Sequence, residues 1–156
     1  MTVHSFVRPT IFFLLAPFFL LAQDSNNPRN ESLILDEDIR AAQLYLLGAP
    51  LTLPILELKT GNNTLMLEFD HLGDELKDYL YTIVHCNSDW QPSDLIDNEY
   101  IDGFTEDRIT TIDNSFNTLY QYTHYTLGLP NRNMRWTKSG NYLLKIVQCA
   151  FATVPS

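Results

Sequence analysis

One segment of the sequence gathers the residue types that most often carry chemistry. It runs from Tyr81 to Leu95, reads YTIVHCNSDWQPSDL, and contains a histidine, a cysteine and two aspartates within ten residues. Imidazole, thiolate and carboxylate groups are the usual protein ligands of zinc, and a thiol with a neighbouring base can act as a nucleophile. The segment therefore raises two hypotheses, a metal site and a catalytic cysteine.

The residues around this segment argue against both hypotheses. Asp78 to Asn87 alternates like a β-strand, so the adjacent His85 and Cys86 point to opposite faces and cannot bind one ion together. His124 is a candidate base for the thiol, but a cysteine on an apolar strand face is more often buried than reactive. We predict no metal, no cofactor and no catalytic residue here.

The polar residues that follow this strand are typical of turns. Asn87-Ser88-Asp89 and Pro92-Ser93-Asp94 carry short side chains that hydrogen-bond to their own backbone. Trp90 lies between them and is expected to anchor the loop by packing. The segment thus predicts a strand that runs into a tight turn.

Acidic side chains elsewhere could serve as a pair of glycosidase carboxylates if two of them faced each other. The candidates lie in polar segments that are typical of a solvated surface: Asp74, Glu75, Asp94, Asp97, Glu99, Asp102, Glu106 and Asp107. The ligand spacing of an EF-hand, a glycine-rich phosphate loop, a G-x-S-x-G motif and a Walker lysine are all absent from the sequence. We therefore predict that the protein is not an enzyme and has no small-molecule substrate.

The amino terminus is typical of a secretory signal peptide. A segment with one basic residue, Arg8, precedes the apolar run IFFLLAPFFLLA, which ends at Ala22. The run is twelve residues long and contains Pro17, so it is too short for a membrane span. We predict a signal peptide over residues 1–22, followed by a flexible polar lead over residues 23–38.

The charge of the mature chain excludes two classes of partner. The signal segment holds one of the 10 basic residues and none of the 19 acidic ones, so cleavage changes the formal charge from −9 to −10. Such a surface repels phosphate backbones and anionic headgroups. We predict no binding to nucleic acid and no direct docking on an anionic membrane.

The rest of the chain alternates between short segments typical of strands and residues typical of turns. Residues 39–47 fit either a helix or a strand. Residues 54–58 and 64–70 flank Gly61-Asn62-Asn63 and predict a hairpin. Asp78–Asn87, with both faces largely apolar, fits a strand that is covered on both sides or lies in the middle of a sandwich.

The second half of the chain continues this pattern. A long irregular segment is expected over residues 88–117. Strands are predicted over residues 119–129 and 142–147, with turns at Pro130-Asn131 and Ser139-Gly140. About seven strands and almost no helix predict an all-β fold, an immunoglobulin-like β-sandwich over residues 39–147.

Two cysteines remain in the predicted exported chain. A disulfide between Cys86 and Cys149 would enclose 62 residues and is permitted in an oxidising compartment. Trp90 follows Cys86 too closely for the Cys, Trp, Cys pattern of an immunoglobulin domain. The sequence leaves the pairing open.

Aromatic residues suggest two further local features. Tyr120, Tyr122 and His124 would share one face of the predicted strand, where such rings could bind sugars or proteins. They motivate an alternative function, a carbohydrate-binding β-sandwich module. Arg132 or Arg135 could stack on Trp136 as a cation over a ring.

Several distinctive segments resemble a known family. They are LTLPILEL, LEFDHLGDELKDY, DYLYTIVHCNSDWQPSDLIDNEYIDGF, RIT, SFNTLYQYTHYTLGLPN and TKSGNYLLKI. In order and spacing, over residues 39–147, they resemble the first domain of the type IX secretion system plug proteins, formerly a Bacteroidetes domain of unknown function.

The resemblance implies a periplasmic, β-rich protein without enzymatic activity or cofactor. Members of the family close the periplasmic side of a large outer-membrane translocon barrel. The expected partner is therefore that barrel, and the expected location is the periplasm, at the outer membrane through protein contact. Sealing by contact needs a rigid scaffold that presents a broad surface.

The sequence departs from the family pattern after residue 147. The tail over residues 148–156, QCAFATVPS, is unlike the family, and we interpret it as a possible truncation that removes the last strand or strands of the sandwich. Such a loss would leave an open edge beside Tyr142–Val147, which invites pairing with another chain.

A partner-binding surface is predicted on the loop Ser88–Phe104. Trp90, Tyr100 and Phe104 are the expected anchors, because aromatic side chains dominate the energetics of protein interfaces. The alternative is that the same residues form the loop's own core.

Overall fold

The computed structural model describes residues 33–58 and 63–149, and this part of the chain forms nine strands and one short helix. The elements, in chain order, are β1 (Ile39–Leu46), β2 (Leu65–Leu72), β3 (Tyr79–Cys86), α1 (Asp97–Tyr100), β4 (Ile101–Gly103), β5 (Glu106–Arg108), β6 (Thr111–Asn114), β7 (Tyr122–Leu129), β8 (Met134–Trp136) and β9 (Asn141–Gln148). The predicted signal peptide, most of the predicted lead and most of the tail lie outside the described residues. No helix in the described part is long and apolar enough to cross a membrane.

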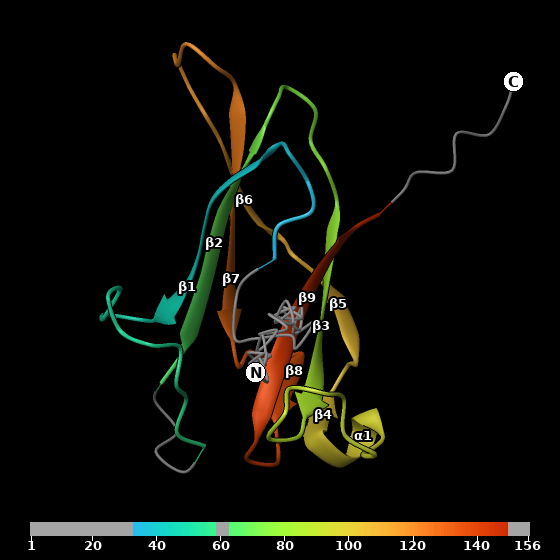
Figure 1. Ribbon diagram of the computed structural model, residues 1–156. Coiled ribbons are helices and arrows are strands. Elements are labelled where there is room, and N and C mark those ends of the chain that lie inside the picture. Colours follow the sequence, from blue (N-terminus) through green and yellow to red (C-terminus); the bar gives the residue numbers. More distant parts are fainter. Residues whose placement is uncertain (1–32, 59–62, 150–156) are drawn as a thin grey trace, which may run out of the picture.

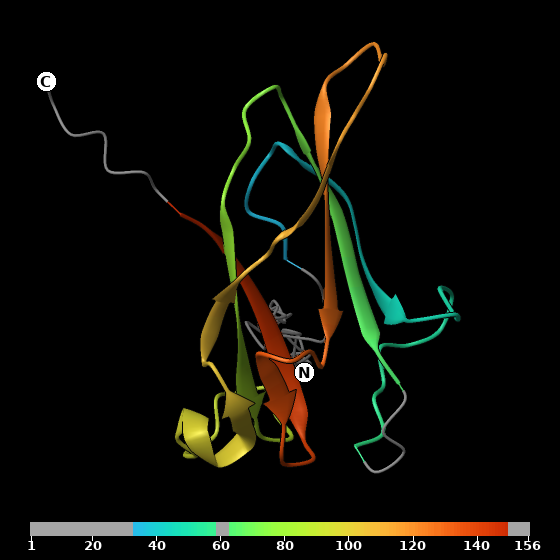
Figure 2. The ribbon, with the colours of Figure 1, turned by 180° about the vertical axis from the view of Figure 1, so that it is seen from behind.

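Two antiparallel sheets face each other, as Figures 1 and 2 show from opposite sides. The first sheet has the strand order β1-β2-β7-β6, and the second has the order β5-β3-β9. A two-stranded ribbon of β4 and β8 lies beside α1 at one end of the molecule (Figure 1). The predicted all-β sandwich is confirmed.

The core lies between the two sheets and is rich in aromatic rings. Tyr79, Tyr81 and Ile83 point inward from β3, and Tyr125 points inward from β7. The ring of Phe69 stacks on Tyr125 with centroids 5.0 Å apart, and Tyr79 meets both rings edge-on. Such ring pairs contribute about 0.5–1.5 kcal/mol beyond the area that they bury.

β3 is the middle strand of its sheet. The sequence left two interpretations open for it, a strand covered on both sides and a strand in the middle of a sandwich. Its inward residues are nearly inaccessible, whereas Leu80, Thr82 and Val84 on the other face are half-buried. Cover on the outer face is therefore partial: these three residues are half-buried, and Cys86 at the end of the strand is buried.

The ambiguous segment at residues 39–47 is a strand, β1, at the edge of the first sheet. Its pairing with β2 shifts register between Arg40 and Gln43, and Ala41 has a φ of 52°. This irregularity is a bulge, which commonly protects an edge strand against pairing with other chains.

The predicted hairpin of residues 54–58 with residues 64–70 is wrong. Residues 54–58 form no strand, and the partners of β2 are β1 on one side and β7 on the other. Alternation identifies a strand but not its partner. One of the two partners of β2, β7, lies fifty or more residues away in the sequence.

The segment at residues 88–117 is less irregular than predicted. It contains α1, β4, β5 and β6, each three or four residues long. Elements this short span at most two alternations, so no periodicity marks them in the sequence.

The strand predicted to start at residue 119 starts at Tyr122. Leu119 and Tyr120 lie in the β6–β7 loop and are 92% and 76% exposed. Asn117, in the same loop, has a left-handed backbone with φ at 56°.

The two cysteines do not pair. Cys86 lies opposite Asn141 in the β3–β9 ladder, whereas the N–H of Cys149 bonds to Asp78 at the other end of β3. Eight residues of strand separate the two positions by about 26 Å, and a disulfide needs Cα atoms within about 7 Å. Both thiols are free, so the possible disulfide is excluded in this fold.

β9 is an edge strand in the described part of the chain. It pairs with β3 on one side, and no described strand covers its other side. The expected open edge beside Tyr142–Val147 is therefore present, and Val147 is 56% exposed on it.

Candidate partner-binding surface

The loop after β3 is held in shape by its own polar side chains. The Oδ1 atom of Asn87 accepts hydrogen bonds from the N–H groups of Asp89 and Gln91, at 2.9 and 3.0 Å. The N–H of Trp90 also bonds to the carbonyl of Asn87. The turn predicted at Asn87-Ser88-Asp89 is thus confirmed, with the expected side-chain bonds to backbone.

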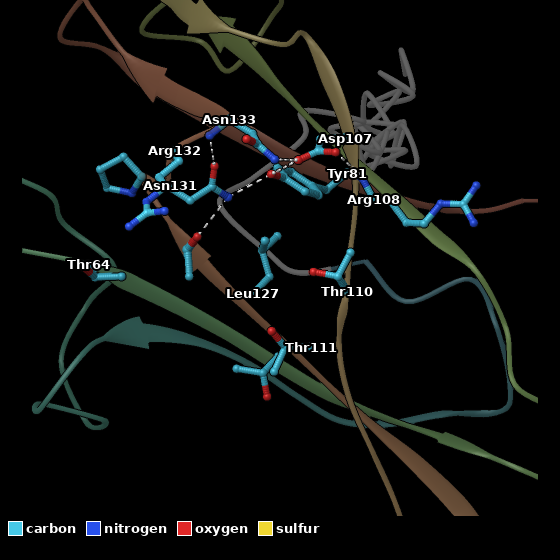
Figure 3. A pocket seen from close by; sticks show the side chains of 13 residues that line it. Thr64, Tyr81, Asp107, Arg108, Thr110, Thr111, Leu127, Asn131, Arg132 and Asn133 are labelled. Carbon is cyan, nitrogen blue, oxygen red and sulfur yellow. Dashed lines mark hydrogen bonds between the residues drawn. The ribbon is translucent and has the colours of Figure 1, made fainter.

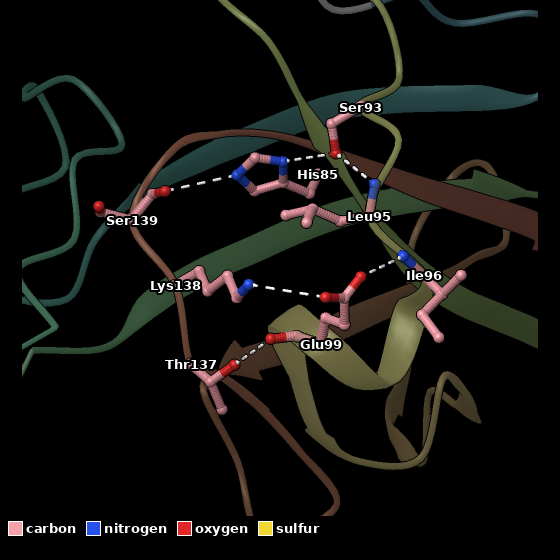
Figure 4. Close-up of polar contacts among 8 residues, drawn as sticks. All are labelled: His85, Ser93, Leu95, Ile96, Glu99, Thr137, Lys138 and Ser139. Atoms are coloured by element: carbon pink, nitrogen blue, oxygen red, sulfur yellow. Dashed lines mark hydrogen bonds and ion pairs between the residues drawn. The ribbon is translucent and has the colours of Figure 1, made fainter.

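A second turn follows, and His85 holds it. The Nδ1 atom of His85 lies 2.8 Å from the hydroxyl of Ser93, which also accepts a hydrogen bond from the N–H of Leu95 (Figure 4). The N–H of Ser93 bonds to the carbonyl of His85 at 2.9 Å. His85 therefore positions this loop against the end of β3.

The next element, α1, is tied to the β8–β9 connection. Glu99 accepts a hydrogen bond from the N–H of Ile96 at 3.0 Å and lies 3.9 Å from the ammonium of Lys138. The hydroxyl of Thr137 donates to the carbonyl of Glu99 at 3.0 Å (Figure 4). These contacts link α1 to the residue before it and to the β8–β9 connection. They hold the backbone that carries the exposed side chains of the loop in place.

The three predicted anchors occupy different environments. Trp90 is half-buried, Phe104 is 62% exposed, and Tyr100 is only 2% exposed. Tyr100 lies in the core beside the rings of His85 and Tyr142. Tyr100 therefore belongs to the loop's own core, which is the second of the two interpretations, because the helix α1 turns it inward; its hydroxyl donates to Asp97 at 2.6 Å.

The exposed apolar side chains of this loop are Phe104 and a residue that the sequence interpretation missed, Ile96, which is 64% exposed. Ile96 immediately precedes α1 and Phe104 immediately follows β4. Single exposed apolar residues are common on protein surfaces, so the sequence offers no clear signal for Ile96.

A second exposed apolar group is also missed by the sequence interpretation. Phe116, Leu119 and Tyr120 project from the β6–β7 loop, and Phe116 is 93% exposed. This loop lies at the opposite end of the sandwich from α1 and β4 (Figure 1). The alternating pattern places two of these residues on a strand, so it does not identify them as part of a loop tip.

The aromatic face proposed for sugar binding is present only in part. Tyr122 and His124 share the half-buried outer face of β7, where His124 bonds through Nδ1 to Asp70 at 2.7 Å. Tyr120 precedes the strand and lies in the β6–β7 loop. The cation over Trp136 is also not seen, because Arg135 pairs with Asp102 at 2.9 Å and Trp136 packs edge-on against Tyr142.

The cysteine at the end of β3 is buried and unsuited to nucleophilic chemistry. Burial raises the pKa of the Cys86 thiol above its ordinary value, so the protonated form dominates. The candidate base His124 lies on β7, in the opposite sheet. No group of three or more histidine, cysteine or acidic side chains in the described residues is placed to hold a metal ion.

Comparison with known proteins decides the family. Residues 39–152 match the family described as the type 9 secretion system plug protein 1st domain. The chain belongs to this family. The match covers the whole described sandwich, so the resemblance noted in the sequence is confirmed for this plug domain.

A solved structure has the same fold. The crystal structure of a hypothetical protein from Parabacteroides merdae ATCC 43184, at 2.30 Å resolution, is 34% identical and superimposes with a TM-score of 0.69 over 72% of this chain. The matched region spans 28% of that protein. A search of curated proteins gave no significant match.

Proposed function

We propose that this plug domain is a non-enzymatic, periplasmic component of the type IX secretion system that binds and seals the outer-membrane translocon. Its association with the outer membrane is through protein contact. The observation that carries the proposal is the family match over residues 39–152. A rigid sandwich with apolar side chains exposed on fixed loops supports it, since such side chains mark protein-binding surfaces.

We assign the contact to the surface around the loop Ser88–Phe104. Ile96 and Phe104 present apolar area there, with Trp90 half-buried in the same loop. The hydrogen bonds of Asn87 and Glu99 hold the loop in place before any partner binds. A preorganised loop loses little conformational entropy on binding, so more of the contact energy appears as affinity.

An affinity capture from native outer-membrane extract tests the proposal. The tagged chain is expected to retain a large β-barrel protein, identified by mass spectrometry. Phe104→Ser is expected to weaken the capture about tenfold, which corresponds to about 1.4 kcal/mol.

Phe116→Ser is the matched control, because it removes an equally large exposed side chain at the opposite end of the sandwich. Loss of capture in Phe116→Ser but not in Phe104→Ser would move the contact to the β6–β7 loop. If the folded chain, checked by circular dichroism, retains no barrel protein at all, the proposed function is rejected.

A further inference from the structure

A polar groove opens on the side of the sandwich where the chain crosses from β5 to β6. Its volume is about 490 Å³, which lies within the range of ligand-binding sites. β7 forms the floor, the β7–β8 turn forms one wall, and Thr110 and Thr111 form the other (Figure 3). The groove is distinct from the Ser88–Phe104 loop, and none of the sequence-predicted anchors lines it.

One wall of the groove is fixed by a closed hydrogen-bond network. The hydroxyl of Tyr81 donates to Asp107 at 3.1 Å and accepts from Asn131 at 2.8 Å, while Asn133 donates to Asp107 at 2.8 Å (Figure 3). Burial works to raise the pKa of Asp107, but the bonds from Asn133, Tyr81 and the N–H of Arg108 outweigh it and lower that pKa. The carboxylate of Asp107, the one carboxylate that lines the groove, therefore already has its hydrogen-bond partners within the protein.

The other polar side chains of the groove are free to bind. The hydroxyls of Thr64, Thr110, Thr111 and Thr126 and the guanidinium of Arg132 have no hydrogen-bond or ion-pair partner in the described part of the chain. By contrast, Arg108 pairs with Asp78 at 2.7 Å, and Arg135 pairs with Asp102. An unpaired arginine and four unpaired hydroxyls that line the same groove can bind a carboxylate with further hydrogen-bonding groups.

The floor of the groove offers backbone as well as side chains. The ladder between β6 and β7 starts at the pair Thr111 and Thr126, so β6 does not cover the last three residues of β7. In this region, Leu127–Leu129, the one described neighbouring strand is β2. The carbonyl of Gly128 accepts a hydrogen bond from the side-chain amide of Asn131 at 3.2 Å, so an extended peptide would pair with the remaining backbone groups of this short uncovered edge.

We propose that this groove binds an extended segment of a protein partner and that Arg132 pairs with an acidic side chain of that segment. The uncovered edge of β7 selects the extended backbone, the threonine hydroxyls hydrogen-bond to it, and Arg132 selects the acidic residue. The inference rests on the proposed function in one respect only, the identity of the protein that supplies the segment. Peptide binding can succeed or fail whatever the barrel capture shows.

Two degenerate libraries of acetylated and amidated pentapeptides provide the probes, one with a central Glu and one with a central Gln. Binding to the folded chain is followed by ¹⁵N–¹H chemical-shift mapping. The Glu library is expected to shift the amide signals of Thr110, Thr111 and Leu127–Leu129, and the Gln library to bind at least tenfold more weakly. Free glutarate at high concentration is expected to compete only partly, because it lacks the peptide backbone.

Two substitutions and a control locate the effect. Arg132→Gln is expected to weaken binding of the Glu library at least tenfold and to abolish its preference over the Gln library. Thr111→Val, which keeps the shape of the side chain, is expected to weaken both libraries equally. Arg135→Gln removes the same charge three residues away and should change neither.

Two results would overturn the proposal. One is the absence of shifts around the groove with either library in the folded chain. The other is an equal loss in Arg135→Gln and Arg132→Gln, which would mean a general charge effect. The first result, together with shifts in the groove with neutral oligosaccharides, would assign the groove to a sugar.

Discussion

Tyr125 joins the core to the β2–β3 connection through a single hydroxyl. That hydroxyl accepts a hydrogen bond from the N–H of Lys77 at 3.1 Å and donates one to its carbonyl at 2.8 Å. Tyr125→Phe leaves both backbone groups of Lys77 without their partner, so we expect the free energy of unfolding to fall by about 1–3 kcal/mol. Urea denaturation measures the loss.

Tyr122→Phe is the control for this prediction. Tyr122 lies on the same strand, but it is half-buried and its hydroxyl has no hydrogen bond in the described part of the chain. Its substitution should change stability by less than about 0.5 kcal/mol. Equal effects of the two substitutions would show that the two bonds to Lys77 contribute nothing.

The two thiols should differ sharply in reactivity. Cys86 is buried and its pKa is raised by that burial, whereas Cys149 is half-buried at the end of β9. We expect one thiol of the native chain to react readily with iodoacetamide and the second to react only after unfolding. A reductant should leave the denaturation midpoint unchanged, and a clear drop in that midpoint would instead indicate a disulfide.

The ribbon of β4 and β8 depends on the absence of a side chain at Gly103. This residue has a φ of 119°, and a Cβ at its position would collide with the backbone carbonyl of Asn133. Gly103→Ala is therefore expected to lower the free energy of unfolding by at least about 2 kcal/mol, from backbone strain and the clash together.

Gly48→Ala separates the two contributions. Gly48 also has a positive φ, of 85°, but no atom lies within 4 Å of the point that a Cβ would occupy, so only the strain of about 1 kcal/mol remains. If thermal denaturation shows the same loss for both substitutions, the close packing of β4 on the β7–β8 turn has no energetic weight.

The long strands could be predicted from the sequence, but the short ones could not. β3, β7 and β9 are each eight residues long, and apolar residues occupy several of every second position in their sequences. β4 and β8 are three residues each and form because they meet across about thirty residues of chain. Pairing at that distance depends on the tertiary fold, which no local pattern encodes.

The same limit explains the error at Tyr100. An aromatic residue in a polar loop is equally consistent with a surface anchor and with a buried ring. Its burial depends on β3 and β9, which bring His85 and Tyr142 against it. Phe104, four residues further on, stays exposed because the chain leaves β4 there and turns toward β5.

At the scale of the whole molecule, the core buries several tyrosines in their neutral form. Burial raises the pKa of Tyr79 well above the ordinary value of 10.0, and it raises the pKa of Tyr100 and of Tyr142 to about 12. The three residues belong to β3, α1 and β9, so ionisation of any one of them opposes the packing of the sandwich.

These shifts predict that the sandwich unfolds in alkali. Below pH 10 the tyrosines are neutral in both the folded and the unfolded chain, so their contribution to stability is fully present. Between pH 10 and about pH 12 the unfolded chain loses these protons while the folded chain keeps them, so stability falls as the pH rises. We expect tyrosinate absorbance to rise in two steps, the second coinciding with the loss of the β-sheet circular dichroism signal. A single step near pH 10 with the β-sheet signal intact would show that the aromatic core does not hold the two sheets together.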